Sequence, residues 1–225
     1  MTKPRTLEVT FNASGAAEAG RRGRVAVIVD VVDASTSAEA ALANGAAAVL
    51  GAAPAGADVP VPVDPAGVGR KAAALAGRMG TTAVVVAEPR VGTEEDRRKR
   101  ALPVLQALRT ASVEYELVAN QGAELPGLVD VKGLVVVIVS TTGGAAFDAA
   151  IAQGSPAACF GTTARVEGKT GWDVLGLGAR RAVELADEHS ADLSIVAASA
   201  NSTDDCLAAF ELARRVMAEG YLQRQ

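Results

Sequence analysis

The sequence predicts an α/β fold, with three α/β/α layers, a mostly parallel sheet and two similar βαβ-type halves. Short apolar runs alternate with helical stretches along its 225 residues, which is the pattern of a parallel sheet covered by helices. The runs are nearly continuous rather than interleaved with polar residues, as in strands buried on both faces. One strand–helix–strand unit also recurs later in the chain. Because this length fits one domain, we treat residues 1–225 as a single α/β domain.

Composition and charge restrict the class of partner. Hydrophobic residues make up 49% of the chain but aromatic residues only 3%, so the core must consist of Ala, Val and Leu. The net charge of -4 argues against nucleic acid or an anionic membrane as a partner, since both favour a basic surface. Cys159 and Cys206 form no C-x-x-C pair, which argues against zinc and against a disulfide framework. Since no apolar stretch reaches about 18 residues, we expect a cytoplasmic protein. We also expect the protein to form a homodimer.

Runs of β-branched and other apolar residues give the strand signals. They predict strands over Val25–Val32, Thr82–Ala87, Leu134–Val139 and Leu193–Ala197, and weaker ones over Ala47–Leu50, Tyr115–Val118 and Ala157–Phe160. The intervening stretches predict helices over Ser37–Asn44, Val68–Met79, Glu94–Ala111, Ala145–Gln153, Gly178–His189 and Asp204–Glu219. Thr93 is the expected N-cap of the third helix, with Asp96 completing a capping box. The Gly-, Ala- and Pro-rich stretch from Gly51 to Pro65 is expected to be a loop.

Residues 25–51 and 134–161 follow the same order: an apolar strand, small and hydroxyl residues, a short Ala-rich helix, a glycine and a second apolar run. Gly45 and Gly154 come just after each helix, where glycine is favoured at a helix end. The pattern indicates an internal repeat, although two unrelated βαβ units in an Ala-rich protein also look alike.

Polar residues follow three of the predicted strands. The three clusters are Asp30, Asp33, Ser35, Thr36 and Ser37; Ser140 to Gly144; and Ser199 with Asn201 to Asp205. The carboxyl ends of parallel strands meet at one edge of a sheet, where ligands bind. Hydroxyls and glycine amides at a helix N-terminus favour an anion, and carboxylates beside them favour Mg²⁺ with a bound phosphate. The combination points to phosphoryl transfer or to hydrolysis of a phosphate ester.

Each cluster also has a structural interpretation. The first hydroxyl cluster could cap a helix that begins near Ala38, and the second could form a tight strand-to-helix turn. Asp204 and Asp205 could lie near the dipole of the last helix. Asp30 is the hardest to explain in this way, because a carboxylate in an apolar strand needs a partner or a metal.

The sequence offers little for other chemistries. Its one histidine, His189, falls near the end of a predicted helix, so a Ser-His-Asp triad would depend on this residue alone. No Gly-x-x-x-x-Gly-Lys-[Ser/Thr] loop occurs and no Gly-x-Gly-x-x-Gly follows a strand, so nucleotide cofactors are not indicated. Cys159 is expected in the core, and Trp172 is expected to anchor a loop or an interface.

At these positions the chain resembles the 2-phosphosulfolactate phosphatase family (ComB-like), Mg²⁺-dependent enzymes of coenzyme M biosynthesis. The resemblance runs from about Val25 to the C-terminus. It is carried by Asp30-Val31-Val32-Asp33-Ala34-Ser35-Thr36 with the helix after it, by the turn Thr141-Thr142-Gly143-Gly144-Ala145, and by Asp204-Asp205 at the start of the final helix. It implies phosphatase activity on a small anionic phosphoester such as 2-phosphosulfolactate, with Mg²⁺ as the cofactor.

The residues and the resemblance together give a set of candidate roles. Asp30 and Asp205 are predicted to be catalytic, and the predicted metal ligands are Asp30, Asp33 and Asp204. The predicted substrate-binding residues offer a hydroxyl, a main-chain amide or a cation: Ser35, Thr36, Ser37, Thr141, Thr142, Gly143, Gly144 and Arg165.

Some positions depart from the family pattern. Asp33 stands where the family has Arg, and Gly143 stands where it has Asn. A cation that would hold an anionic substrate is therefore replaced by an anion. The missing positive charge would have to come from another loop, through Arg90, Arg165 or Lys169. The alternative to a phosphatase is a relative with altered chemistry that binds a small ligand, or an oligomeric α/β protein without one.

Overall fold

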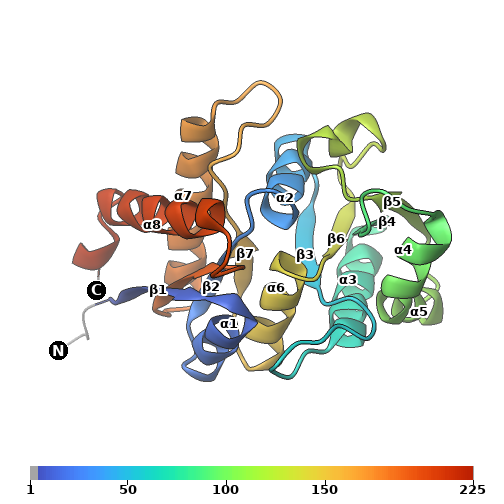
Figure 1. Ribbon diagram of the computed structural model, residues 1–225, viewed down its shortest axis with the longest axis horizontal. Coiled ribbons are helices and arrows are strands. Elements are labelled where there is room, and N and C mark those ends of the chain that lie inside the picture. Colours follow the sequence, from blue (N-terminus) through green and yellow to red (C-terminus); the bar gives the residue numbers. More distant parts are fainter. Residues whose placement is uncertain (1–4, 225) are drawn as a thin grey trace.

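The computed structural model describes residues 5–224 and confirms the predicted class, since strands and helices alternate in an α/β/α arrangement (Figure 1). The strands are β1 (Leu7–Phe11), β2 (Val25–Val29), β3 (Ala48–Ala52), β4 (Ala83–Ala87), β5 (Tyr115–Ala119), β6 (Val135–Val139), β7 (Ala158–Phe160) and β8 (Leu193–Ala197). The α-helices are α1 (Asn12–Arg21), α2 (Ala34–Ala43), α3 (Pro65–Met79), α4 (Glu94–Arg100), α5 (Leu102–Thr110), α6 (Gly143–Ala152), α7 (Gly171–Glu188) and α8 (Thr203–Ala218). Two short 3₁₀ helices are η1 (Gly122–Gly127) and η2 (Tyr221–Gln223).

The strands form two four-stranded sheets in which all neighbouring strands are parallel. The first sheet has the order β1-β8-β2-β7 and the second the order β3-β6-β4-β5. The chain passes between the sheets twice through similar units, β2–α2–β3 and β6–α6–β7. Each unit therefore contributes one strand to each sheet, and the predicted strands are divided between two sheets rather than gathered in one.

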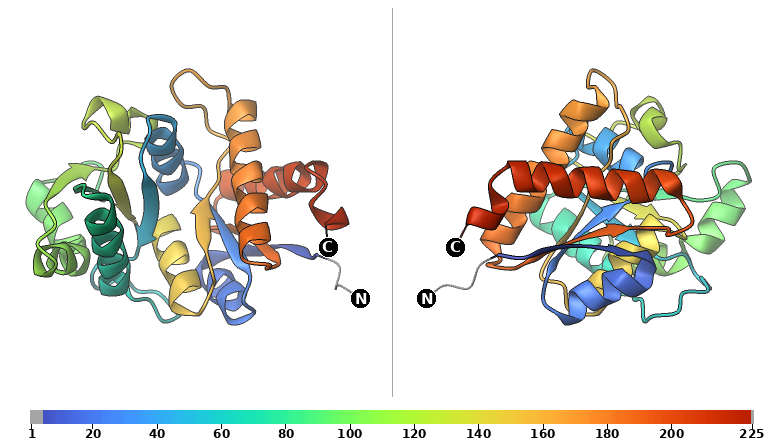
Figure 2. Two further views of the ribbon diagram at one scale, coloured as in Figure 1. Left: turned by 180° about the vertical axis from the view of Figure 1, so that it is seen from behind. Right: turned by 60° about the vertical axis from the view of Figure 1, so that its left-hand side comes forward.

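Helices cover both faces of each sheet. α2 and α6 lie between the sheets and contact strands of both (Figures 1 and 2). α7 and α8 pack on the first sheet from the other side, and α3 packs on the second sheet with α5 beside it. Because of this double coverage, β2 and β6 are buried along their whole length, as their continuous apolar runs predict.

Small side chains allow the central layer to pack closely. Apart from a few aromatic rings, the core consists mainly of Ala, Val, Leu and Ile. A Cβ atom added to Gly51 in β3 would lie 2.7 Å from Cβ of Phe147 and 2.8 Å from Cζ of Phe160. These two rings stack with their centroids 5.2 Å apart, so Gly51 lets β3 approach an aromatic pair. Within residues 5–224, no helix combines the length and the apolar character needed to cross a membrane.

Several helix boundaries differ from the prediction. α2 begins at Ala34 rather than Ser37, and α6 begins at Gly143 rather than Ala145. The hydroxyl and glycine residues that follow the strands therefore lie inside the first helical turns. The predicted helix over residues 94–111 is divided into α4 and α5, with Pro103 in the first turn of α5, where its missing N–H is tolerated. The capping box of α4 is confirmed.

Candidate active site

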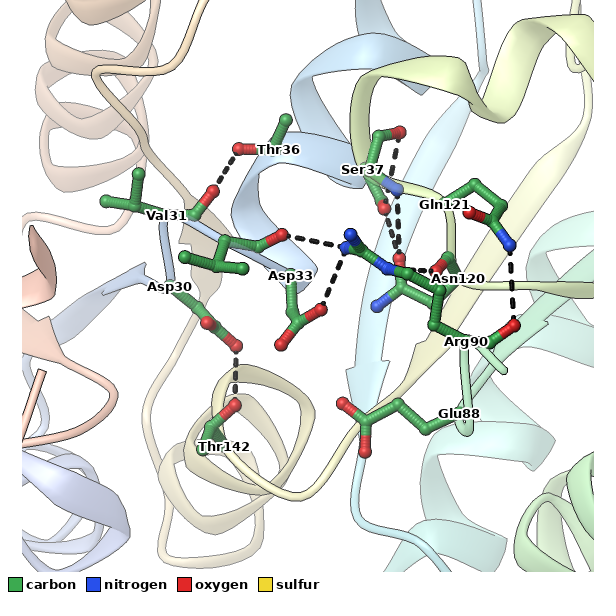
Figure 3. A network of polar contacts seen from close by, with 12 residues as sticks. Asp30, Val31, Asp33, Thr36, Ser37, Glu88, Arg90, Asn120, Gln121 and Thr142 are labelled. Carbon is green, nitrogen blue, oxygen red and sulfur yellow. Dashed lines mark hydrogen bonds and ion pairs between the residues drawn. The ribbon is translucent and has the colours of Figure 1, made fainter. Parts of the chain in front are cut away.

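Side-chain hydrogen bonds and an ion pair join the carboxyl ends of four strands into one group of residues, here called the strand-end network (Figure 3). Its members are Asp30, Asp33 and Ser37 after β2, Glu88 and Arg90 after β4, Asn120 after β5, and Thr141 and Thr142 after β6. β2 belongs to one sheet and the other strands to the second. The predicted convergence of polar strand ends therefore occurs across the two sheets.

Asp30 lies at the end of β2 with only 4% of its surface exposed. Its Oδ2 atom accepts hydrogen bonds from Thr142 Oγ1 and from the main-chain N–H of Gly143, both at 2.7 Å. Burial raises the pKa of Asp30 above its ordinary value, while these two hydrogen bonds oppose the rise. A Cβ atom on Gly143 would lie 2.6 Å from the same oxygen, so only glycine leaves room for the carboxylate at the N-terminus of α6. The buried carboxylate that the sequence singles out thus has polar partners from the second similar unit.

The three hydroxyls of the first cluster are buried in the first turn of α2. Ser35 Oγ accepts from the N–H of Asp30 at 2.8 Å and donates to the carbonyl oxygen of Ile28 at 2.9 Å. Thr36 donates to the carbonyl oxygen of Val31. These bonds connect α2 to the turn that carries Asp30. The hydroxyls therefore hold the turn that carries Asp30. They do not cap α2, whose N-cap position is Asp33.

Arg90 is the cation of the strand-end network that contacts Asp33. Its Nη2 atom lies 3.1 Å from Oδ1 of Asp33 and donates to the carbonyl oxygen of Val32 at 3.0 Å. Its Nε atom donates to the carbonyl oxygen of Asn120 at 3.1 Å. Of the three cations that could replace the missing arginine, Arg90 is therefore the one held against Asp33 itself. Figure 3 shows its guanidinium between the ends of β2 and β5.

Glu88 adds a further carboxylate that sequence reasoning missed. Its Oε2 atom accepts from both the N–H and the hydroxyl of Thr141, each at 3.2 Å. Burial raises the pKa of Glu88, and the nearby charge of Asp33 raises it further. The available signal was the same as for Asp30, because Glu88 also directly follows an apolar strand that is buried throughout.

The two acidic residues in the first turn of α8 differ in burial. Asp204 points to solvent, whereas Asp205 is 3% exposed. Asp205 accepts from the N–H of Val31 at 2.9 Å and from the N–H of Ser199 at 3.2 Å, so it ties α8 to the turn after β2. Burial raises the pKa of Asp205 to about 6. The N-cap of α8 is Ser202, whose hydroxyl accepts from the N–H of Asp205.

Arg165 lies in the loop between β7 and α7, outside the strand-end network. Together with Lys169 it lines a groove of about 770 Å³ between η1 and residues 165–171. A contact of 3.4 Å between the hydroxyls of Thr36 and Thr162 joins the beginning of the loop after β7 to α2. No hydrogen bond or ion pair within residues 5–224 connects Arg165 to the strand-end network. Arg165 is therefore not joined to Thr141 and Thr142, which are predicted to bind the substrate together with it.

The predicted metal ligands do not converge as a set of three. No group of three or more His, Cys, Asp or Glu side chains among residues 5–224 is arranged to hold an ion. Asp204 lies on the exposed side of α8, while Asp30 and Asp33 are electrostatic neighbours. Mg²⁺ commonly binds through only one or two carboxylates, keeping several waters and a substrate phosphate. Of the three predicted ligands, only Asp30 and Asp33 lie close enough to act on each other electrostatically, whereas Asp204 is exposed.

No protein-family model matches the chain, and no curated protein matches it. The resemblance to the 2-phosphosulfolactate phosphatase family therefore stays a prediction from the motifs.

Proposed function

We propose that the chain hydrolyses a small anionic phosphoester, such as 2-phosphosulfolactate, with Mg²⁺ as its cofactor. The observation that carries the proposal is the position of Arg90, whose guanidinium lies 3.1 Å from Asp33 beside the buried Asp30. Arg90 supplies from another loop the positive charge that Asp33 removes from the family pattern. A guanidinium suits phosphate because it keeps its charge, and Nη1 is the atom left to donate, since Nε and Nη2 already donate to main-chain oxygens and to Asp33.

We assign different roles in the reaction to different residues of the strand-end network. Asp30 and Asp33 would hold Mg²⁺, which when bound offsets the negative charge of the phosphoryl group. Arg90 binds the phosphate oxygens and stabilises their charge as the bond from phosphorus to the alcohol oxygen breaks. Water adds to phosphorus, and the products are the alcohol and inorganic phosphate. Asp205 is a positioning residue, because it holds the N–H of Val31 next to Asp30.

The first test is phosphate release from 2-phosphosulfolactate and a panel of small phosphoesters, with Mg²⁺ and with EDTA. Asp30→Asn removes a carboxylate that would hold Mg²⁺, and we expect kcat to fall by about 100-fold or more, because the charge of the metal is worth several kcal/mol in the transition state. Asp148→Asn is the matched control. Asp148 is 1% exposed and also accepts two main-chain N–H groups, but they belong to Ala53 and Asp64, outside the strand-end network.

Turnover that requires Mg²⁺, falls in Asp30→Asn and persists in folded Asp148→Asn would support the proposal. A lack of turnover on every ester, or full activity of Asp30→Asn, would overturn it. We also expect Arg90→Gln to raise KM more than Arg165→Gln does, because only Arg90 belongs to the strand-end network.

The second candidate function is binding of a small anion without turnover. It is favoured by Asp33, because a carboxylate stands there where the family pattern has the arginine of a catalytic site. An anion that binds the folded state raises the melting temperature whether or not it is hydrolysed. A rise in Tm with phosphate, together with no phosphate release from any ester, would favour this candidate over the phosphatase.

A further inference from the structure

Asn120 is a polar residue of the strand-end network whose side chain is only half used. It follows β5 directly and is completely buried, with 0% of its surface exposed. Its Oδ1 atom accepts from the hydroxyl of Ser37 and from the N–H of Gly122, the latter at 3.4 Å. Among residues 5–224, its Nδ2 atom is one of two buried side-chain polar atoms without a hydrogen-bond partner, the other being Thr6 Oγ1.

The orientation of this amide is fixed by its neighbours. A main-chain N–H can only donate, so the atom that faces Gly122 must be the carbonyl oxygen of Asn120. The NH₂ group must then point the opposite way. Figure 3 shows it turned away from Ser37, toward the side on which Asp33 and Arg90 lie. The unpaired donor therefore faces the interior of the strand-end network.

An unpaired buried donor is unfavourable in a folded protein and calls for an explanation. The main chain of Asn120 is held by Arg90, whose Nε atom donates to its carbonyl oxygen at 3.1 Å. The guanidinium and the side-chain amide consequently come from two loops fastened to each other. Both groups are donors, and neither an amide NH₂ nor a guanidinium binds a metal ion. A ligand that satisfies both groups therefore has to bring acceptor oxygens.

We infer that the side-chain NH₂ of Asn120 donates to an oxygen of a bound oxyanion, beside the guanidinium of Arg90. Asn120 is then a specificity-determining residue that selects ligands with a phosphate-like or sulfonate-like group. The identification of this oxyanion with the phosphate of a hydrolysed ester rests on the proposed function. The binding of an oxyanion by Asn120 does not, because it requires no turnover.

The test uses inorganic phosphate and sulfate as probes on the full chain treated with EDTA, with calorimetry and thermal shift as readouts. We expect Asn120→Ala to weaken phosphate binding by about 10-fold or more, the loss typical of a hydrogen bond to a charged group. Gln121→Ala is the matched control. Gln121 is the next residue in the loop, and its amide already donates to the carbonyl oxygen of Arg90 at 3.4 Å.

A second readout needs no substitution at Asn120. The chain contains four asparagines, Asn12, Asn44, Asn120 and Asn201, so labelling asparagine side chains with ¹⁵N gives four NH₂ signals. Variants at the other three positions assign the Asn120 signal by elimination. Phosphate should shift this signal selectively, which a residue that only supports Ser37 and Gly122 would not show. This readout also decides the matter if Asn120→Ala fails to fold.

The inference is overturned if the parent protein binds neither phosphate nor sulfate at millimolar concentration. Equal phosphate affinity of Asn120→Ala and the parent, or an unshifted Asn120 signal, would overturn it as well. Failure of the phosphatase proposal looks different, because phosphoesters would not be hydrolysed while phosphate binding still depended on Asn120. Hydrolysis that is indifferent to Asn120→Ala would leave the phosphatase standing and remove the inference.

Discussion

The units β2–α2–β3 and β6–α6–β7 share a backbone plan but differ in the residue that directly follows their first strand. In both, the helix N-cap has an uncommon conformation: φ is -123° and ψ -94° at Asp33, and φ is -110° and ψ -84° at Thr142. In both, a glycine with positive φ follows the helix, Gly45 at 85° and Gly154 at 97°. The shared plan therefore extends from the strand end to the end of the helix.

The difference lies in what the strand-end residue does. Ser140 closes its own turn, because its Oγ atom accepts from the N–H of Gly144 at 2.7 Å. Asp30, at the corresponding place, instead reaches the other unit and accepts from Thr142 and Gly143. The same position is thus used for a local turn in one unit and for the candidate site in the other. The candidate site therefore arises where one unit departs from the plan that the two units share.

The largest expected effect concerns the sixth residue after each N-cap, which is Glu39 in α2 and Asp148 in α6. Glu39 is buried and makes two hydrogen bonds to Arg181, at 2.7 and 2.9 Å, whereas Asp148 accepts from main-chain amides. Arg181→Met would leave Glu39 without its cation, and we expect a loss of about 3–5 kcal/mol in the free energy of unfolding, measured with urea. Adding Glu39→Gln should restore much of it. A loss below about 1 kcal/mol would show that the pair is not needed for α2.

The next effect tests the first residue of each helix, Ala34 in α2 and Gly143 in α6. A Cβ atom on Gly143 would lie 2.7 Å from the Cβ of Ala34, so only one of the two positions can carry a side chain. We expect Gly143→Ala to destabilise the fold by about 2 kcal/mol and to displace Asp30. The control is Gly77→Ala in α3, where nothing lies within 4 Å. It should stabilise by about 0.5–1 kcal/mol, and equal Tm values for the two variants would contradict the close approach.

The smallest expected effect is a pH dependence of the free energy of unfolding, caused by Asp148 in the unit β6–α6–β7. Burial raises the pKa of Asp148 from 3.8 to about 6, so the folded state holds its proton more tightly than the unfolded chain does. This contribution to stability is present below pH 4 and is lost as the pH rises through 6. In Asp148→Asn the free energy of unfolding should therefore fall less between pH 4 and 7, by on the order of 1–2 kcal/mol. An unchanged pH profile would place the titrating group elsewhere, Asp205 being the first alternative.

Several features of the fold could be predicted because their signals are local. The five-residue strands β2 and β6 are apolar throughout, and the capping box of Thr93 and Asp96 is visible within four residues. β1 and α1 were missed because their local signals are weak. β1 is an edge strand without a fully buried residue, and its sequence includes Glu8 and Thr10, so its apolar signal is weak. The early start of α7, at Gly171 rather than Gly178, was missed because Gly171 and Gly176 are residues typical of loops.

By itself, the sequence determined the alternation of strands and helices, the burial of β2, and the placing of a carboxylate at its end. These are set by residues within a few positions of one another. Only the tertiary structure decided that β2 and β6 belong to different sheets, so that Asp30 accepts from Gly143, 113 residues away. It also decided that Arg90, rather than Arg165, lies against Asp33. The physical reason is that contacts between distant residues depend on how all the helices pack between and around the sheets, which no short stretch encodes.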